Sequence, residues 1–91
     1  ITGPTANVLT SLNGGWSYTW QGDNADIYPK NLTNKTILES FRKRLGPTRI
    51  DYFNSSSFDE LFDIDALLNA AQSASYILVC LGEKPYTETP G

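Results

Sequence analysis

The chain has 91 residues, enough for one small domain with a modest core. Ten acidic and seven basic residues give a net charge of −3, so there is no basic field for a nucleic-acid backbone. The sequence holds no histidine, one cysteine, and no apolar run near the ~20 residues of a membrane helix. We therefore expect no metal, no cofactor, no internal disulfide, no nucleic-acid partner and no membrane span.

The first half of the chain contains one clear helix signal. Residues 1–4 (Ile-Thr-Gly-Pro) are typical of a strand end that runs into a turn. Residues 36–39 (Thr-Ile-Leu-Glu) match the capping box that starts a helix. Apolar residues then recur on one helical face, at Ile37, Leu38, Phe41 and Leu45. Gly46-Pro47 predicts the end of this helix.

The second half predicts further alternation of strand and helix. Residues 48–53 indicate a short strand, and residues 54–57 a loop. A second helix is expected to begin near Asp63 or Asp65 and to run to about Ala74. The apolar run 76–81 then indicates a parallel strand buried on both faces, with Cys80 as plain core packing.

This order of elements predicts an α/β fold: a mostly parallel sheet flanked by helices, a three-layer sandwich, present as an incomplete domain fragment. In such sheets the ligand site lies beyond the carboxyl ends of the strands. The loop at residues 14–22 follows the first strand end, and the loop at residues 82–89 follows the last strand. We therefore expect both loops at the same rim of the sheet.

The loop at residues 14–22 (Gly-Gly-Trp-Ser-Tyr-Thr-Trp-Gln-Gly) is rich in aromatic side chains suited to stacking on a sugar ring. Trp16, Tyr18 and Trp20 alternate, so they would share one side of an extended loop. Residues 82–89 (Gly-Glu-Lys-Pro-Tyr-Thr-Glu-Thr) place Glu83 and Glu88 beyond the apolar run. Two carboxylates about 5 Å apart are what retaining glycoside cleavage requires, but the spacing of this pair does not force that distance.

These two loops, together with residues 2–7 and 36–39, closely resemble the second, sandwich domain of glycoside hydrolase family three, the β-glucosidase and exo-β-glucanase type. The resemblance spans essentially all 91 residues. It implies that residues 1–91 are the N-terminal half of that domain, with the barrel domain and the rest of the sandwich absent. It also implies a role in hydrolysing terminal β-D-glucosyl residues, with the nucleophilic aspartate supplied by the missing barrel domain.

The resemblance also implies roles for individual residues. Glu88 matches the general acid/base, and Glu83 matches a glutamate that orders the loop or helps to hold the domains together. Trp20 lines the position of the leaving sugar, with Trp16 and Tyr86 as further substrate-binding side chains, although Trp16 serves mainly in packing. The fragment alone would be inactive, since it holds only one half of the active site. Its expected partners are a β-glucoside or β-glucan oligosaccharide and the barrel domain.

One alternative is a noncatalytic carbohydrate-binding α/β module that uses Trp20 and Trp16 as a platform. A nucleotide-binding fold is disfavoured, because the turn after residue 3 lacks the glycine spacing and the lysine of a phosphate cradle. Three N-glycosylation patterns begin at Asn31, Asn34 and Asn54. With the resemblance, they favour a secreted or periplasmic location.

Overall fold

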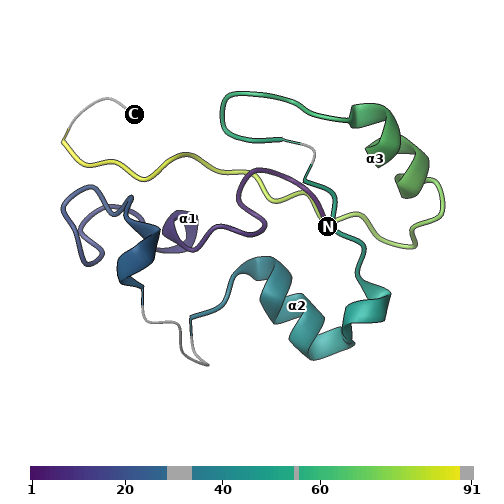
Figure 1. Cartoon of the computed structure of the whole chain (residues 1–91), viewed down its shortest axis with the longest axis horizontal. Helices are drawn as coiled ribbons and strands as arrows, with labels where there is room; N and C mark the ends of the chain where they lie inside the picture. The colour runs from purple at the N-terminus through teal and green to yellow at the C-terminus, as the bar shows by residue number, and fades with distance from the viewer. Residues whose placement is uncertain (29–33, 55, 89–91) are drawn as a thin grey trace.

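The computed structural model describes residues 1–28, 34–54 and 56–88, in a flat body of 42 × 30 × 17 Å (Figure 1). The chain forms short helical segments joined by long connections: α1 (Thr10–Asn13), η1 (Ala25–Ile27), α2 (Ile37–Leu45), η2 (Pro47–Arg49) and α3 (Ile64–Ala71). The two longer helices, α2 and α3, lie on the same half of the molecule, and the loops that the sequence singled out lie on the other half (Figure 1).

Helix α2 has the bounds that local signals predicted. The Thr36 hydroxyl accepts a hydrogen bond from the Glu39 amide at 3.1 Å, and the Glu39 carboxylate accepts one from the Thr36 amide at 2.9 Å. This capping box satisfies two amides that the first turn leaves without helical partners. Gly46 ends the helix with φ 89°, and its amide donates to the Arg42 carbonyl. The predicted helix is confirmed.

The predicted second helix is confirmed as α3, but it ends earlier than predicted. Asp63 caps it, since its carboxylate accepts a hydrogen bond from the Ala66 amide at 3.0 Å. The helix ends at Ala71 rather than near Ala74. Beyond it, the amides of Ser73 and Ala74 donate to carbonyls three residues back, which is the tighter pattern of a terminal turn.

The prediction of a mostly parallel sheet was wrong. Over the described ranges the chain has no strand, only isolated bridges: Thr2 pairs in parallel with Phe53 and with Val79, and Ser56 pairs antiparallel with Leu61. The segment that contains Thr2 cannot continue either pairing into a strand, because Gly3 follows with φ 104° and the chain turns there. A side chain at Gly3 would also meet the Cys80 carbonyl oxygen at 2.2 Å, so only glycine allows this close crossing.

The predicted strand at residues 48–53 shortens to the bridge at Phe53, because residues 47–49 form η2 instead. The predicted three-layer sandwich is excluded by thickness. A sheet with a helix layer on each face needs about 30 Å, and the shortest extent of the molecule is 17 Å.

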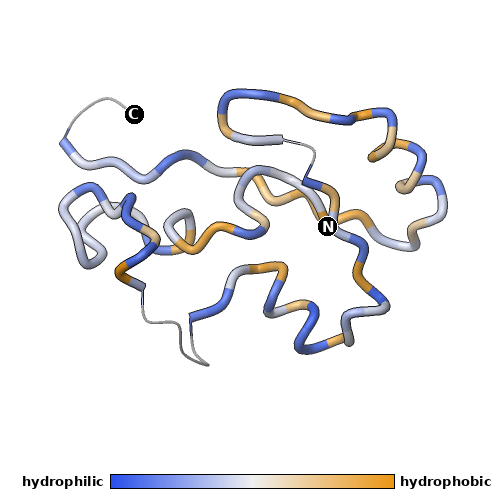
Figure 2. The backbone as a smooth tube through the Cα atoms, in the orientation of Figure 1, coloured by the Kyte–Doolittle hydropathy of each residue, from blue (hydrophilic) through white to orange (hydrophobic). Residues whose placement is uncertain are grey.

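The apolar run 76–81 is largely exposed, so the prediction of a strand buried on both faces was also wrong. Tyr76 is 93% exposed and Leu81 77%. Figure 2 shows apolar residues along this stretch, which leads from α3 towards the N-terminus. The buried apolar core of the described chain is small and consists of Ala6, Tyr28, Leu38 and Cys80.

Cys80 is a buried free thiol, as predicted. Burial raises the pKa of this thiol above its ordinary value. The folded chain therefore holds the thiol proton more tightly than the unfolded chain does. The resulting stability is fully present below the unfolded thiol pKa of about 8.5 and is lost as the pH rises through the folded value.

We expect the urea midpoint of the chain to fall between about pH 8 and about pH 10 more steeply than the midpoint of a Cys80→Ala variant. The variant also loses packing, so only the pH dependence of the difference between the two proteins reports the thiol. Parallel pH profiles for the two proteins would contradict the burial of this group.

Candidate functional site

The aromatic loop begins directly after α1 and closes on itself. Gly14 caps α1 with φ 75°, and its amide donates to the Thr10 carbonyl at 3.0 Å. The Trp16 amide then donates to the Trp20 carbonyl at 2.9 Å, and the Gly22 amide donates to the Thr19 hydroxyl at 3.1 Å. These bonds make residues 16–20 a compact turn and not an extended segment.

The turn brings the two tryptophans together. Their ring centroids lie 6.4 Å apart at an interplanar angle of 52°, within the range of attractive aromatic pairs. Trp16 is 70% exposed and Trp20 48%, so both indoles present area to solvent. Tyr18 packs instead edge-on against the buried Tyr28, with centroids 5.2 Å apart. The extended conformation assumed for the alternation of the three rings is absent.

Thr87 joins the terminal loop to the aromatic loop. Its amide donates to the side-chain oxygen of Gln21 at 2.8 Å, and its hydroxyl donates to the Trp20 carbonyl at 3.0 Å. Gly15 allows this approach, because a side chain there would meet the Thr87 methyl at 2.0 Å and the Tyr86 carbonyl oxygen at 2.8 Å. The two loops that the sequence singled out are therefore in direct contact, although no sheet rim brings them there.

Backbone strain is concentrated in these same two loops. In the part of the chain that the structure describes, the non-glycine residues with positive φ are Trp16 (62°), Tyr18 (63°) and Glu88 (56°). Each such residue costs about 1–3 kcal/mol and persists only where its surroundings enforce it. Strain of this kind gathers at functional sites, so it independently marks the region that the sequence motifs indicate.

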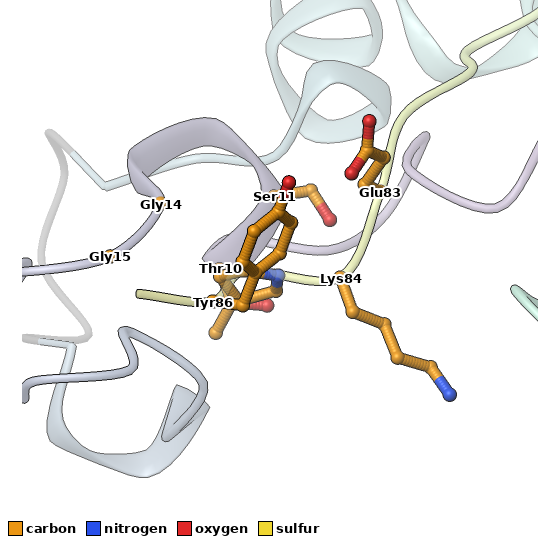
Figure 3. Close-up of a pocket in the computed structure, with 8 residues that line it drawn as sticks. Thr10, Ser11, Gly14, Gly15, Glu83, Lys84 and Tyr86 are labelled. Carbon is orange, nitrogen blue, oxygen red and sulfur yellow. The ribbon is translucent and has the colours of Figure 1, made fainter. Parts of the chain in front are cut away.

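A hollow of about 220 Å³ lies between α1 and the start of the terminal loop (Figure 3). It is lined by Thr10, Ser11, Gly14, Gly15, Glu83, Lys84, Pro85 and Tyr86. Figure 3 shows the Tyr86 ring beside the α1 residues and Lys84 extending away from them. The Ser11 hydroxyl is buried and has no hydrogen-bond partner among the described residues.

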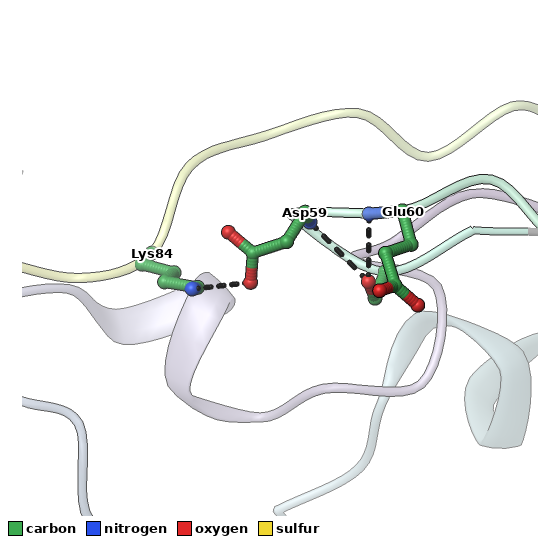
Figure 4. Close-up of polar contacts among 4 residues, drawn as sticks. Asp59, Glu60 and Lys84 are labelled. Carbon is green, nitrogen blue, oxygen red and sulfur yellow. Dashed lines mark hydrogen bonds and ion pairs between the residues drawn. The ribbon is translucent and has the colours of Figure 1, made fainter.

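Lys84 connects the terminal loop to a second turn (Figure 4). Its ammonium group lies 2.7 Å from the Asp59 carboxylate and 6.0 Å from the centre of the Phe58 ring. The Ser57 hydroxyl accepts hydrogen bonds from the amides of Asp59 and Glu60, which shapes this turn. Both charged side chains are more than half exposed, so the ion pair contributes little to stability.

The predicted site residues fall into two neighbouring groups. Glu88 follows Thr87, which contacts the Trp20 carbonyl, and Trp16 packs on Trp20. Glu83 and Tyr86 line the hollow, which neither indole nor Glu88 lines. Glu88 is exposed.

Glu83 makes no hydrogen bond or ion pair with any described residue, and its neighbour Lys84 forms the ion pair instead. The last motif residue, Thr89, lies outside the described residues.

Two residues that connect the loops had no sequence signal of their own. Gln21 is one of the polar residues of the aromatic loop, and Thr87 is one of those of the terminal loop. Glutamine and threonine are common in loops, so the residue types at positions 21 and 87 do not by themselves indicate a contact. Their contact joins positions 66 residues apart, which no local pattern encodes.

The described residues meet neither the requirements of a metal site nor those of a membrane-spanning helix. No cluster of three or more potential metal ligands occurs within the described ranges. Among the helices that the structure describes, none has the length and apolar character needed to cross a bilayer.

Comparison with known proteins tests the family resemblance. No family model matches the chain. Over its full length the chain is 34% identical to a protein named lysosomal beta glucosidase from Dictyostelium discoideum, in an alignment of 101 residues. The chain spans 12% of the length of that relative. The similarity supports a relationship to glycoside hydrolases of the β-glucosidase type, and it covers only a short part of that relative.

Proposed function

We propose that the chain is part of a retaining β-glycosidase, of the β-glucosidase or exo-glucanase type, that hydrolyses terminal β-D-glucosyl residues. The similarity to a beta glucosidase over the whole chain supports this assignment. The observation that carries it is the contact at Thr87, which joins the loop with two exposed indoles to the loop with Glu88. A stacking platform and a carboxylate on adjacent loops are the parts that this reaction needs from one side of a sugar site.

Glu88 serves as the general acid/base in this proposal. It donates a proton to the glycosidic oxygen as the bond to the leaving sugar breaks, and it later removes a proton from the attacking water. Its exposure in this chain leaves the carboxyl open to a substrate and to a second domain. The nucleophile is an aspartate of the barrel domain, held about 5 Å from Glu88 across the anomeric carbon.

Trp20, Trp16 and Tyr86 form the sugar-binding surface of this half-site. The two indoles offer exposed faces for the polarised C–H groups of a pyranose, and Tyr86 lines the adjacent hollow. Glu83 keeps the loop-ordering role in this proposal through contacts made in the complete glycosidase, because its carboxylate bonds to no described residue of this chain. No cofactor is required, because both half-reactions use only carboxyl groups and water.

For the complete glycosidase we propose a location in the secretory pathway, because the relative from Dictyostelium discoideum is named a lysosomal beta glucosidase. Asn54 is an exposed start of a glycosylation pattern. In the Asn34 pattern the hydroxyl residue, Thr36, is instead buried in the capping box of α2. The pattern at Asn31 lies outside the described residues.

Hydrolysis by the complete glycosidase tests this function. With an aryl β-D-glucoside as substrate, the first sugar product seen by proton NMR should be the β-anomer, because two displacements retain the configuration. The 91-residue chain alone should show no hydrolysis, since it holds no nucleophile for the reaction. A complete protein that binds glucan oligosaccharides without cleaving any β-glucoside would instead support a noncatalytic carbohydrate-binding module.

A further inference from the structure

We propose that Gln21 is a positioning residue for Glu88: its side-chain carbonyl oxygen fixes the backbone from which the acid/base carboxyl projects. This inference rests on the proposed function of Glu88. It concerns a residue that neither the motifs nor the similarity to known proteins assigns to the reaction.

The first step of the argument is the directness of the contact. The Thr87 amide donates to the Gln21 side chain at 2.8 Å, and the Thr87 hydroxyl donates to the Trp20 carbonyl at 3.0 Å. Thr87 is only 9% exposed, so water competes weakly for both bonds. The residue immediately before Glu88 is thus held at two points by consecutive residues of the aromatic loop.

The second step is the strain at Glu88. Its φ of 56° is a left-handed conformation that a glutamate adopts only under restraint from its surroundings. Relaxation to negative φ would turn the bond from Cα to Cβ and would change the direction in which the carboxyl projects from the loop. The Gln21 contact restrains the chain one residue before this point, where such a rotation would begin.

The third step is the chemistry of the Gln21 side chain. An amide oxygen accepts a hydrogen bond as a carboxylate does, but it carries no charge. Leucine has a similar size and no acceptor, so it would leave the buried Thr87 amide without this partner. Glutamate keeps an oxygen within reach of the amide. These two substitutions therefore separate the hydrogen bond from the volume of the side chain.

The test uses the complete glycosidase and two β-glucosides, an alkyl glucoside with a poor leaving group and 2,4-dinitrophenyl glucoside with a good one. A misplaced acid costs up to about 100-fold, so Gln21→Leu should lower kcat/KM for the alkyl glucoside about 10- to 100-fold. The dinitrophenyl glucoside needs little protonation and should lose less than about threefold. Gln21→Glu should recover the alkyl glucoside to within about threefold of the unsubstituted enzyme.

A matched control is Gln72→Leu, at the exposed end of α3, which should leave both substrates unchanged. Equal losses for both substrates in Gln21→Leu, with or without a lowered melting temperature, would overturn the positioning role. Full activity of Gln21→Leu, or failure of Gln21→Glu to recover the alkyl glucoside, would also overturn it. If Glu88→Gln itself shows no dependence on the leaving group, the proposed function of Glu88 fails.

Discussion

Replacement of Glu88 by glutamine in the complete glycosidase is expected to lower kcat/KM for alkyl glucosides by about 10²- to 10⁴-fold. Glutamine keeps the shape of the side chain but cannot donate an acidic proton to the departing oxygen. With 2,4-dinitrophenyl glucoside the first step should be nearly unchanged, because that leaving group departs without protonation. Its turnover should still slow, since the water that completes the reaction loses its general base. Stopped-flow release of dinitrophenol should therefore show a burst followed by a slow steady state.

Two comparisons sharpen this experiment. Azide needs no general base, so it should accelerate the steady state of Glu88→Gln and yield β-glucosyl azide. Glu83→Gln alters a glutamate five positions earlier in the same loop and should affect the two substrates equally, as expected for a residue that orders the loop. Equal losses for both substrates in Glu88→Gln, or no gain with azide, would exclude Glu88 as the acid/base.

The helices could be predicted from the sequence because their signals are local. Thr36 and Glu39 lie one helical turn apart, and their reciprocal bonds depend on nothing beyond that turn. Asp63 caps α3 in the same way. Gly46 ends α2 because a residue without a side chain adopts φ 89° without strain. Each of these features can be deduced from fewer than ten consecutive residues.

The sheet could not be predicted, because pairing depends on distant segments. Thr2 does lie between Phe53 and Val79, as a parallel arrangement requires. Whether that contact extends into a ladder is decided at Gly3, where the chain crosses the Cys80 carbonyl and turns. The apolar content of residues 76–81 indicated a buried strand, yet apolar content alone does not supply the elements that would cover it. Most of this run is exposed.

The meeting of the two loops was correctly expected, but for a reason that the structure does not support. The expectation relied on strand ends at one rim, whereas the contact is made by hydrogen bonds from Thr87 to Gln21 and Trp20. The prediction that the three aromatic rings share one side of an extended loop was wrong, because the backbone at Trp16 and Tyr18 is in the left-handed conformation. Nothing in their residue types favours that conformation, so only the surrounding contacts can impose it.

Gly15→Ala is expected to separate the two loops. The added methyl group would lie 2.0 Å from the Thr87 methyl and 2.8 Å from the Tyr86 carbonyl oxygen, so the terminal loop must move. Overpacking of this kind costs about 1–3 kcal/mol of stability. It should also break the bonds from Thr87 to the aromatic loop, which hold the segment before Glu88. We expect faster hydrogen exchange at the Thr87 amide, measured by mass spectrometry, and a loss of activity of about 10-fold or more.

Gly14→Ala is the matched control one residue earlier. A methyl group at Gly14 meets nothing within 4 Å, but φ 75° with ψ −168° is a conformation almost confined to glycine, so alanine should cost about 1–3 kcal/mol there. Both variants should therefore lose stability to a similar extent, while only Gly15→Ala should expose the Thr87 amide and reduce activity. If the two variants lose activity equally, general destabilisation explains the loss. The close approach at Gly15 would then have no specific role in holding the backbone that precedes Glu88.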